Sequence, residues 1–554
     1  MIPSAQIRTA HVDSFIRDRL PPAEQWPVLL LDRPEFRYPD RLNCVTELLD
    51  RWVENGAGER PCLISPNESL SYGELAGRVN RIANILTERF GLLPGNRVLL
   101  RAANNPMLVA VYLAVMKAGG IAVATMPLLR ARELAYPIEK ARIRLAVCDA
   151  RLGEEMEKAR ALAPALERIL YFGGEGEDDL LRLMPAASPR FTACDTASDD
   201  VCLIGFTSGT TGEPKGTIHF HRDVLAVADG YSRQVLRPVA EDRFIGSPPL
   251  AFTFGLGGLV VFPLRVGASA VLLEKATPDD LLAAIDRYGA TITFTAPTAY
   301  RAMLAKMGAG SLKSLRKCVS AGETLPKPIF DAWLERTGIK LMDGIGATEM
   351  LHIFIAAREE EIHPGATGIP VPGYEARVVD AAGEEVPRGT PGRLAVRGPT
   401  GCRYLDDPRQ LHYVQNGWNM TGDTYIQDAD GYFWFQARSD DMIICSGYNI
   451  AGPEVEVALL SHPDVLECAV IGVPDPERGM VPKAFIVLAP GRIGDSAMVK
   501  ALQEHVKAEI APYKYPRAIE FRSALPKTHS GKLQRFRLRE EAAVMPHIST
   551  AGAR

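Results

Sequence analysis

FTSGTTGEPKGT, residues 206–217, is the stretch of this sequence that decides the fold. It combines glycines, hydroxyl side chains, a proline and one lysine, and it lies between the apolar run VCLI at residues 201–204 and a predicted helix past His221. Glycines let the backbone approach an anion closely, while amide, hydroxyl and ammonium groups converge on its oxygens. The stretch therefore predicts a phosphate-binding loop, with Lys215 as its charged member.

The order of residues in this loop differs from that of a P-loop NTPase. The Walker A pattern G-x-x-x-x-G-K-[ST] is absent, because Gly216 follows the lysine and the preceding glycines are Gly209 and Gly212. A P-loop NTPase is therefore disfavoured. A surface loop rich in Gly, Ser and Thr is the alternative that composition alone would allow.

Length and composition indicate a multidomain globular protein. A chain of 554 residues predicts two or more domains, and 47% hydrophobic with 23% charged residues is typical of soluble proteins. The net charge of −4 produces no global field that would attract nucleic acid or an anionic membrane, so we expect neither as a partner. The most apolar stretch, residues 107–116, is about half as long as a membrane span and predicts a buried helix.

Cysteine usage and the N-terminal sequence favour a cytoplasmic location. The nine cysteines are scattered, odd in number and without a C-x-x-C pair, which favours reduced thiols over a disulfide or zinc framework. The first residues contain no apolar core of signal-peptide length, and Asp13 and Asp18 interrupt any transit-peptide pattern. We therefore expect a reducing, cytoplasmic environment.

Strand and helix patterns alternate through the first part of the chain and predict an α/β fold of stacked layers. Apolar runs that predict strands lie at residues 97–100, 121–125, 145–148, 168–171, 268–273 and 291–294. Residues 375–396 instead predict short strands joined by hairpin turns. We expect a large multi-layered N-terminal domain of sheets and helices with a β-rich subdomain.

A new set of helix and strand patterns that follows Asp440 predicts a second domain. Beyond it we expect a helix from Pro453 and strands at residues 468–473 and 483–488. The predicted organisation is a large domain at residues 1–437, a hinge at residues 438–441 and a small, mobile α+β domain at residues 442–554. The last of these is roughly a hundred residues long, a normal domain size.

Six motifs occur in the order and approximate spacing of the adenylate-forming acyl-CoA synthetases. They are FTSGTTGEPKGT (206–217), GIGATEM (344–350), TGD (421–423), RSDD (438–441), SGYNIAGPEVE (446–456) and PKTHSGKLQR (526–535). The chain resembles that superfamily almost end to end. Within it, DGIGATEMLH (343–352) and TAHVDSFIRDRLPPAEQW (9–26) look most like the aryl-CoA ligases of the benzoate and 2-aminobenzoate type.

The resemblance implies a nucleotide site that uses ATP and Mg²⁺. Thr348 would contact the α-phosphate and Glu349 would bind Mg²⁺, which prefers carboxylate and phosphate oxygens. Taken alone, such a Thr-Glu pair is more often the start of a helix. The loop residues that would hold the phosphates are Thr207, Ser208, Gly209, Thr210, Thr211, Gly212 and Lys215.

The resemblance also assigns the nucleoside. Gly344 and Ile345 would face adenine on an aliphatic surface, because the aromatic residue common in the superfamily is absent, as in the benzoate-type members. Asp423 and Arg438 would hold the ribose hydroxyls, and a carboxylate that accepts two O–H bonds suits that role. A simple turn is the alternative interpretation of the T-G-D triplet.

Three C-terminal residues receive roles from the resemblance. Lys532 would bridge the substrate carboxylate and the α-phosphate, where one ammonium offsets two anions. Asp440 would be the hinge, and Gly447 would let the pantetheine arm of coenzyme A pass close to the backbone. The alternatives are a solvated surface lysine and a helix cap at RSDD.

The acyl pocket is predicted from position in the motifs. Aromatic walls and small floor residues suit a flat ring. His352 could hydrogen-bond an ortho substituent or the carboxylate, although an isolated histidine in an apolar environment is more often a core residue. His219 and His221 have metal-ligand spacing, but no third ligand lies near in sequence. The predicted lining residues are Phe252, Thr253, Phe254, Ala321, Gly322, Gly346, His352 and Ile353.

The expected function is that of an aryl-acid–CoA ligase, which forms an aryl adenylate and then a CoA thioester. Its ligands would be ATP, Mg²⁺, coenzyme A and a small aromatic carboxylate, with 2-aminobenzoate as the first candidate. A medium-chain or other acyl-CoA synthetase and a luciferase-like oxygenase are the alternatives. The sequence leaves the choice between monomer and homodimer open.

Overall fold

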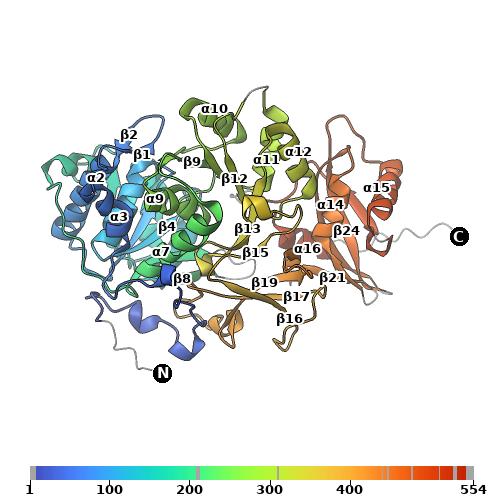
Figure 1. The fold of residues 1–554 in the computed structure, drawn as a ribbon, viewed down its shortest axis with the longest axis horizontal. Coiled ribbons are helices and arrows are strands. Elements are labelled where there is room, and N and C mark those ends of the chain that lie inside the picture. The colour runs from blue at the N-terminus through green and yellow to red at the C-terminus, as the bar shows by residue number, and fades with distance from the viewer. Residues whose placement is uncertain are drawn as a thin grey trace. The chain divides into compact units, whose positions relative to one another are not determined.

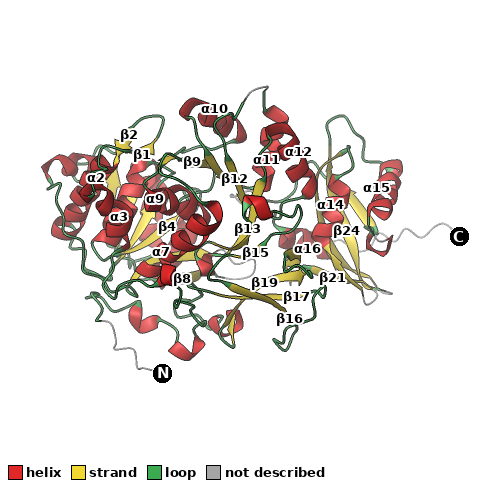
Figure 2. Ribbon diagram, in the orientation of Figure 1, coloured by secondary structure: helices red, strands yellow, loops and turns green. Residues whose placement is uncertain are grey.

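The computed structural model describes residues 8–207, 213–308, 311–438, 441–445, 448–475, 478–510, 512–527 and 533–544. Figures 1 and 2 draw its fold coloured by residue number and by secondary structure. It falls into two compact units. The first comprises Met1–Leu325, Ile329–Ala376 and Ala395–Met420, and the second Pro326–Pro328, Arg377–Leu394 and Thr421–Arg554. The predicted hinge, residues 438–441, lies within the second unit, so the predicted domain boundary stays a prediction.

A six-stranded sheet forms one layer of the first unit. Its neighbours pair in parallel except for the antiparallel pair β7–β8. β3 and β5 are buried along their whole length, as expected for parallel strands with covered faces. The strand order is β6 (Arg168–Phe172), β5 (Leu145–Asp149), β3 (Arg97–Arg101), β4 (Ile121–Thr125), β7 (Val201–Thr207) and β8 (Lys215–Phe220).

The helices that accompany this sheet begin at local signals in the sequence. Ser71 and Glu74 form a capping box at the start of α2 (Tyr72–Asn84), and the Asn105 side chain caps α3 (Pro106–Lys117). Every residue of α3 is buried, which confirms the buried helix predicted there. The other helices of this region are α1 (Arg51–Glu54), α4 (Ala131–Lys140), α5 (Gly153–Leu162), α6 (Leu180–Leu183) and α7 (His221–Val227).

A nine-stranded sheet forms the second layer of the first unit. Its order is β15 (Ile369–Pro370), β14 (Ile353–Ala356), β13 (Leu341–Gly346), β12 (Lys317–Ala321), β11 (Ile292–Thr295), β9 (Arg243–Gly246), β10 (Ser269–Val271), β1 (Pro61–Ile64) and β2 (Ser69–Ser71). The strands from β13 to β1 are parallel. Its helices are α8 (Thr253–Leu256), α9 (Phe262–Val266), α10 (Pro278–Tyr288), α11 (Pro297–Lys306) and α12 (Lys327–Thr337).

Two smaller sheets follow. The first has the order β16 (Glu375–Val379), β17 (Gly392–Arg397), β19 (Trp418–Gln427) and β18 (Val414–Gln415), with β20 (Phe433–Arg438) paired to β19, and α13 (Gln410–Tyr413) precedes β18. The second has the order β22 (Tyr448–Ala451), β21 (Met442–Cys445), β24 (Gly479–Leu488) and β23 (Val465–Asp475), with β25 (Ala518–Phe521) paired to β24. Its helices are α14 (Gly452–Leu460), α15 (Ser496–Glu509) and α16 (Arg535–Val544).

These layers confirm the α/β fold class predicted from the sequence. The predicted strand at residues 121–125 coincides with β4, and those at residues 97–100, 145–148 and 168–171 each end one residue short of the observed strand. Within the described part of the chain, none of the helices is long and apolar enough to span a membrane.

Candidate active site

The predicted phosphate loop is the connection of a β-hairpin. Residues 206–207 end β7 and residues 215–217 begin β8, and Thr207 pairs directly with Lys215. The connection between them lies at the carboxyl end of β7, and the carboxyl edge of parallel strands is where α/β proteins bind ligands. The remaining predicted phosphate ligands, Ser208, Gly209, Thr210, Thr211 and Gly212, lie outside the described residues.

Thr348 and Glu349 come from the other large sheet of the same unit. They form a 3₁₀ turn, Thr348–Met350, directly after β13. The turn packs so closely on β7 that a Cβ atom at Gly205 would lie 2.7 Å from Cγ2 of Thr348. Nε2 of His219, on β8, donates a hydrogen bond of 2.8 Å to the Thr348 carbonyl. The two sheets therefore meet at the two residues predicted to contact ATP and Mg²⁺.

The Glu349 carboxylate lies beside the hairpin lysine. Nζ of Lys215 is 3.7 Å from Oε1 of Glu349, and the Tyr404 hydroxyl donates a hydrogen bond to the same oxygen. Burial and the Glu349 charge raise the pKa of Tyr404 far above its usual value, so the hydroxyl remains a donor. Sequence reasoning missed Tyr404, because no pattern near residue 404 links it to a motif 55 positions away.

The residues around Glu349 fit a magnesium ion. The carboxylate is almost buried, and its hydrogen bond and its ion pair with described residues both involve Oε1. Oε2 makes no hydrogen bond to a described residue and could serve as a hard oxygen ligand, next to a hairpin predicted to hold phosphates. Mg²⁺ in proteins commonly takes one or two carboxylates and completes its shell with water and substrate phosphates. The Glu349 carboxylate beside predicted phosphate ligands matches this usual coordination of Mg²⁺.

A buried ion pair lies below this site. Arg403 donates to the carboxylate of Asp223, and both side chains are fully buried. Burial raises the pKa of Asp223, but Arg403, His219 and Arg222 together outweigh it and hold that pKa below its usual value. Nδ1 of His219 faces the same carboxylate at 3.8 Å. The pair thus supports both His219 and the segment that carries Tyr404.

The chain changes direction between Glu349 and His352. Leu351 adopts φ of 68°, in the left-handed region that favours glycine. A leucine held there stores strain of about 1–3 kcal/mol and persists only where the surroundings enforce it. The Thr400 hydroxyl donates to the neighbouring Met350 carbonyl at 2.8 Å, which contributes to that constraint. The turn separates Glu349, beside the hairpin, from His352, which enters an aromatic box.

His352 lies among four aromatic rings. The centroid distances are 4.5 Å to Phe262, 5.6 Å to Tyr231, 5.8 Å to Phe254 and 6.5 Å to Phe294. Burial lowers the pKa of His352 to about 3, so the ring is neutral at physiological pH. Neither ring nitrogen, nor the hydroxyl of Tyr231, has a hydrogen-bond partner among the described residues. Tyr231 was missed from the sequence, since it lies outside the six motifs and no residue pattern links it to His352.

The other predicted pocket residues lie on or beside the strands β12, β13 and β14 and the helix α8. Ala321 on β12 pairs with Gly344 on β13, and Gly346 pairs with Ile353 on β14. A Cβ atom at Gly344 would lie 2.9 Å from the Ile353 side chain, so this strand must carry glycine to pack. The remaining predicted pocket residues are Gly322, directly after β12, and Phe252, Thr253 and Phe254, at the start of α8, whereas Ile345 on β13 belongs with Gly344 to the predicted adenine contacts. Their contacts with ligands stay predictions.

The predicted ribose ligands belong to the second unit. Asp423 on β19 and Arg438 on β20 are directly opposite one another in the antiparallel pair. The backbone therefore brings together two residues that are 15 positions apart in the sequence. The Arg438 side chain, and the predicted Asp440, Gly447 and Lys532, lie outside the described residues.

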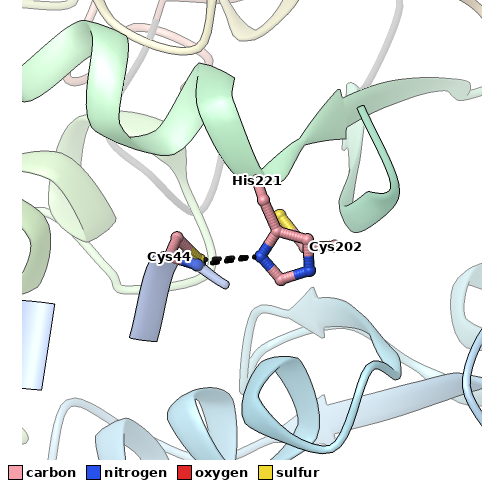
Figure 3. Close-up of side chains that lie close together, drawn as sticks. All are labelled: Cys44, Cys202 and His221. Atoms are coloured by element: carbon pink, nitrogen blue, oxygen red, sulfur yellow. Dashed lines mark hydrogen bonds between the residues drawn. The ribbon is translucent and has the colours of Figure 1, made fainter. Parts of the chain in front are cut away.

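His219 and His221 separate into different environments. His221 is buried with Cys44 and Cys202, and the ligand atoms of the three lie within 4.8 Å of one another (Figure 3). Nδ1 of His221 accepts the Cys44 amide at 3.1 Å, which occupies its lone pair. Structural zinc takes four ligands, whereas this group offers three among the described residues. We assign the cluster to packing: it attaches residues 43–45 to β7 and α7.

Comparison with known proteins identifies the family. Residues 49–403 match the AMP-binding enzyme family, and residues 454–532 match the AMP-binding enzyme C-terminal domain. The chain therefore belongs to the AMP-binding enzymes. This confirms the resemblance to adenylate-forming enzymes that the six sequence motifs indicated.

Individual relatives and a solved structure extend the match over nearly the whole chain. A benzoate–CoA ligase of Thauera aromatica is 39% identical over 513 residues, which cover 91% of this chain and 97% of that protein. A 4-hydroxybenzoate–CoA/benzoate–CoA ligase of Rhodopseudomonas palustris is 35% identical, over 90% of this chain and 94% of that protein. An anthranilate CoA ligase solved with anthranoyl-AMP has a TM-score of 0.88 at 36% identity, over 92% of this chain and 99% of that chain.

Proposed function

We propose that this protein is an ATP-dependent aryl-acid–CoA ligase. It joins a carboxylate to AMP with release of pyrophosphate, and then transfers the aryl group to the thiol of coenzyme A with release of AMP. The observation that carries this proposal is the aromatic box around His352, a residue three positions after Glu349 in the sequence. Apolar rings around a residue three positions from Glu349 suit a substrate with a flat ring and a reactive acid group.

The residues of the first unit have separate tasks in adenylation. Lys215 and Thr207 bind the β- and γ-phosphates, and the Thr348 hydroxyl contacts the α-phosphate. Glu349 holds the position of Mg²⁺, which, when bound, neutralises charge that develops on the phosphates. The buried His219 holds the Thr348 backbone in place. Together these groups orient the α-phosphorus toward the acid.

Residues of the C-terminal region complete the proposal. Lys532 bridges the acid and the α-phosphate, and Asp423 and Arg438 bind the ribose. Outside this region, residues 208–212 complete the phosphate loop. Asp440 is the hinge between a domain at residues 1–437 and a mobile domain at residues 442–554, and Gly447 lines the path of coenzyme A.

A Lys532→Ala variant should lose adenylation but still convert preformed adenylate to thioester; equal loss of both half-reactions would reject this role.

We propose 2-aminobenzoate or a related benzoate as the acid. The relatives named for benzoate, 4-hydroxybenzoate and anthranilate support this class, and a neutral His352 can accept or donate a hydrogen bond to a ring substituent. Cytoplasmic location, the lack of a nucleic-acid or membrane partner, and assembly as a monomer or homodimer stay predictions.

A substrate panel tests the proposal. Benzoate, 2-aminobenzoate, 2-hydroxybenzoate and octanoate are each supplied with ATP, Mg²⁺ and coenzyme A, and AMP release is measured. We expect the aryl acids to give higher kcat/KM than octanoate, with 2-aminobenzoate highest. Preference for octanoate would indicate a medium-chain synthetase, and oxygen-dependent light emission would indicate a luciferase-like oxygenase.

A further inference from the structure

The Glu349 carboxylate is engaged on one side only. The Tyr404 hydroxyl donates to Oε1, and Nζ of Lys215 lies 3.7 Å from the same atom. At that distance the ammonium and the carboxylate attract one another without a hydrogen bond. Among the described residues no hydrogen bond reaches Oε2, so the two oxygens of this carboxylate differ in their hydrogen bonding.

Tyr404 is itself fixed from several directions. Its backbone N–H donates to Oε1 of Gln410 at 2.9 Å, and its ring packs edge-on against Tyr413 at 5.7 Å between centroids. The preceding residue, Arg403, is held by the buried ion pair with Asp223. A hydroxyl anchored in this way has little freedom to follow the carboxylate. It therefore determines which direction Oε1 faces.

The lysine of the phosphate hairpin is held by the same tyrosine. The Lys215 ammonium lies 4.8 Å from the centre of the Tyr404 ring and 5.8 Å from that of Tyr413. Two ring faces and one carboxylate form a small cation site, which Lys215 occupies. The Lys215 side chain is 22% exposed, so it can leave this site toward solvent or a ligand.

We propose that Tyr404 is a positioning residue for Glu349, and that Lys215 is a resident counter-ion of this carboxylate which a divalent cation displaces. Tyr404 holds Oε1, so that Oε2 is presented to the cation. Once the cation neutralises Glu349, the ammonium is repelled and becomes available to phosphate oxygens. The inference rests on the proposed function, because it takes Glu349 as the ligand of the divalent cation.

Binding of Mn²⁺, followed by electron paramagnetic resonance in the presence of a non-hydrolysable ATP analogue, tests the positioning role. Tyr404→Phe keeps the ring but removes a charge-assisted hydrogen bond, so we expect Mn²⁺ affinity to fall about tenfold to a hundredfold. Tyr72→Phe is the matched control, since it removes another buried hydroxyl, one that donates to the Ala268 carbonyl. Unchanged Mn²⁺ affinity in Tyr404→Phe, or an equal loss in Tyr72→Phe, would overturn the role.

Nuclear magnetic resonance of ¹³C-dimethylated lysines tests the displacement. The Lys215 resonance, assigned by its loss in Lys215→Arg, should show a ring-current shift that disappears on addition of Mg²⁺ and the ATP analogue. The shift should persist in Tyr404→Phe, which keeps the ring, and be reduced in Tyr404→Leu, in which the more distant Tyr413 ring remains. A Lys215 resonance that Mg²⁺ and nucleotide leave unchanged would refute displacement. Both measurements omit acid and coenzyme A, so failure of the substrate panel would not affect them.

Discussion

Nε2 of His219 donates a hydrogen bond of 2.8 Å to the carbonyl oxygen of Thr348. His219 lies on β8 of the six-stranded sheet, and Thr348 follows β13 of the nine-stranded sheet. One buried hydrogen bond therefore connects the two layers where the predicted ATP contacts meet. With Nε2 as the donor, Nδ1 faces the Asp223 carboxylate, which is 3.8 Å away.

Replacement of His219 by Phe should slow adenylation by about tenfold to a hundredfold, because the Thr348 carbonyl loses its buried donor. Acid-dependent exchange of pyrophosphate into ATP measures this step alone. His219→Gln, whose amide can still donate, should recover part of the rate. Exchange at the wild-type rate in the Phe variant would show that the hydrogen bond does not position the turn.

Gly205→Ala should displace the Thr348–Met350 turn, because the added Cβ would lie 2.7 Å from Cγ2 of Thr348. We expect adenylation to fall about tenfold or more from this overlap. Thr348→Ser removes Cγ2 but keeps the hydroxyl, so the double variant should be faster than Gly205→Ala alone. A double-mutant cycle of adenylation rates measures this coupling. Strictly additive losses would place the cost of the alanine elsewhere.

His352 should make the protein less stable in acid. Its pKa is about 3 in the folded protein against 6.5 for the free side chain. Below pH 6.5 the unfolded chain binds a proton that the folded protein does not. The contribution of His352 to the free energy of unfolding is therefore complete above pH 6.5 and declines as the pH falls toward 3. His352→Phe should remove a slope of up to about 1.4 kcal/mol per pH unit.

The corresponding measurement is the unfolding temperature at about pH 8 and about pH 5. The decrease between the two should be smaller in His352→Phe than in the wild-type protein. The other titrating groups are shared by both proteins, so the difference isolates His352. An identical decrease in the two proteins would contradict a neutral, buried imidazole.

Tyr231→Phe should alter the preference among aryl acids. The Tyr231 hydroxyl is buried beside His352 and has no hydrogen-bond partner among the described residues, so its removal should not lower the unfolding temperature. If this hydroxyl meets a ring substituent, the ratio of kcat/KM for 2-aminobenzoate to that for benzoate should fall about tenfold. An unchanged ratio would place the substituent away from Tyr231.

Individual strands and helices of the fold were predictable because the sequence patterns that specify them are local. β4 coincides with its predicted range because an apolar run there follows two glycines, and α3 was recognised from its continuous apolar sequence. The supporting residues of the site were not predictable in this way. Tyr404 contacts Glu349 from 55 positions away, and Arg403 contacts Asp223 from 180 positions away. Neither periodicity nor motif spacing records such distant contacts.

The predicted metal-ligand spacing of His219 and His221 gives a second example. The two residues are only two positions apart, yet His219 faces Thr348 and His221 faces Cys44. His219 is the last residue but one of β8, and α7 begins at His221, so the change of backbone conformation sends the rings apart. The sequence predicted a helix just past His221, but it could not show which distant segments the two rings would contact.

The sequence by itself determined the family, the order of strands and helices, and the identity of the residues expected to touch ATP, because each depends on short segments with their own physical signature. Only the tertiary structure decided how those residues are held. It brought Thr348 and Glu349 of one sheet against Lys215 and His219 of another, placed Tyr404 over the lysine, and enclosed His352 in aromatic rings. These contacts arise from the packing of distant segments, which local composition and spacing do not encode.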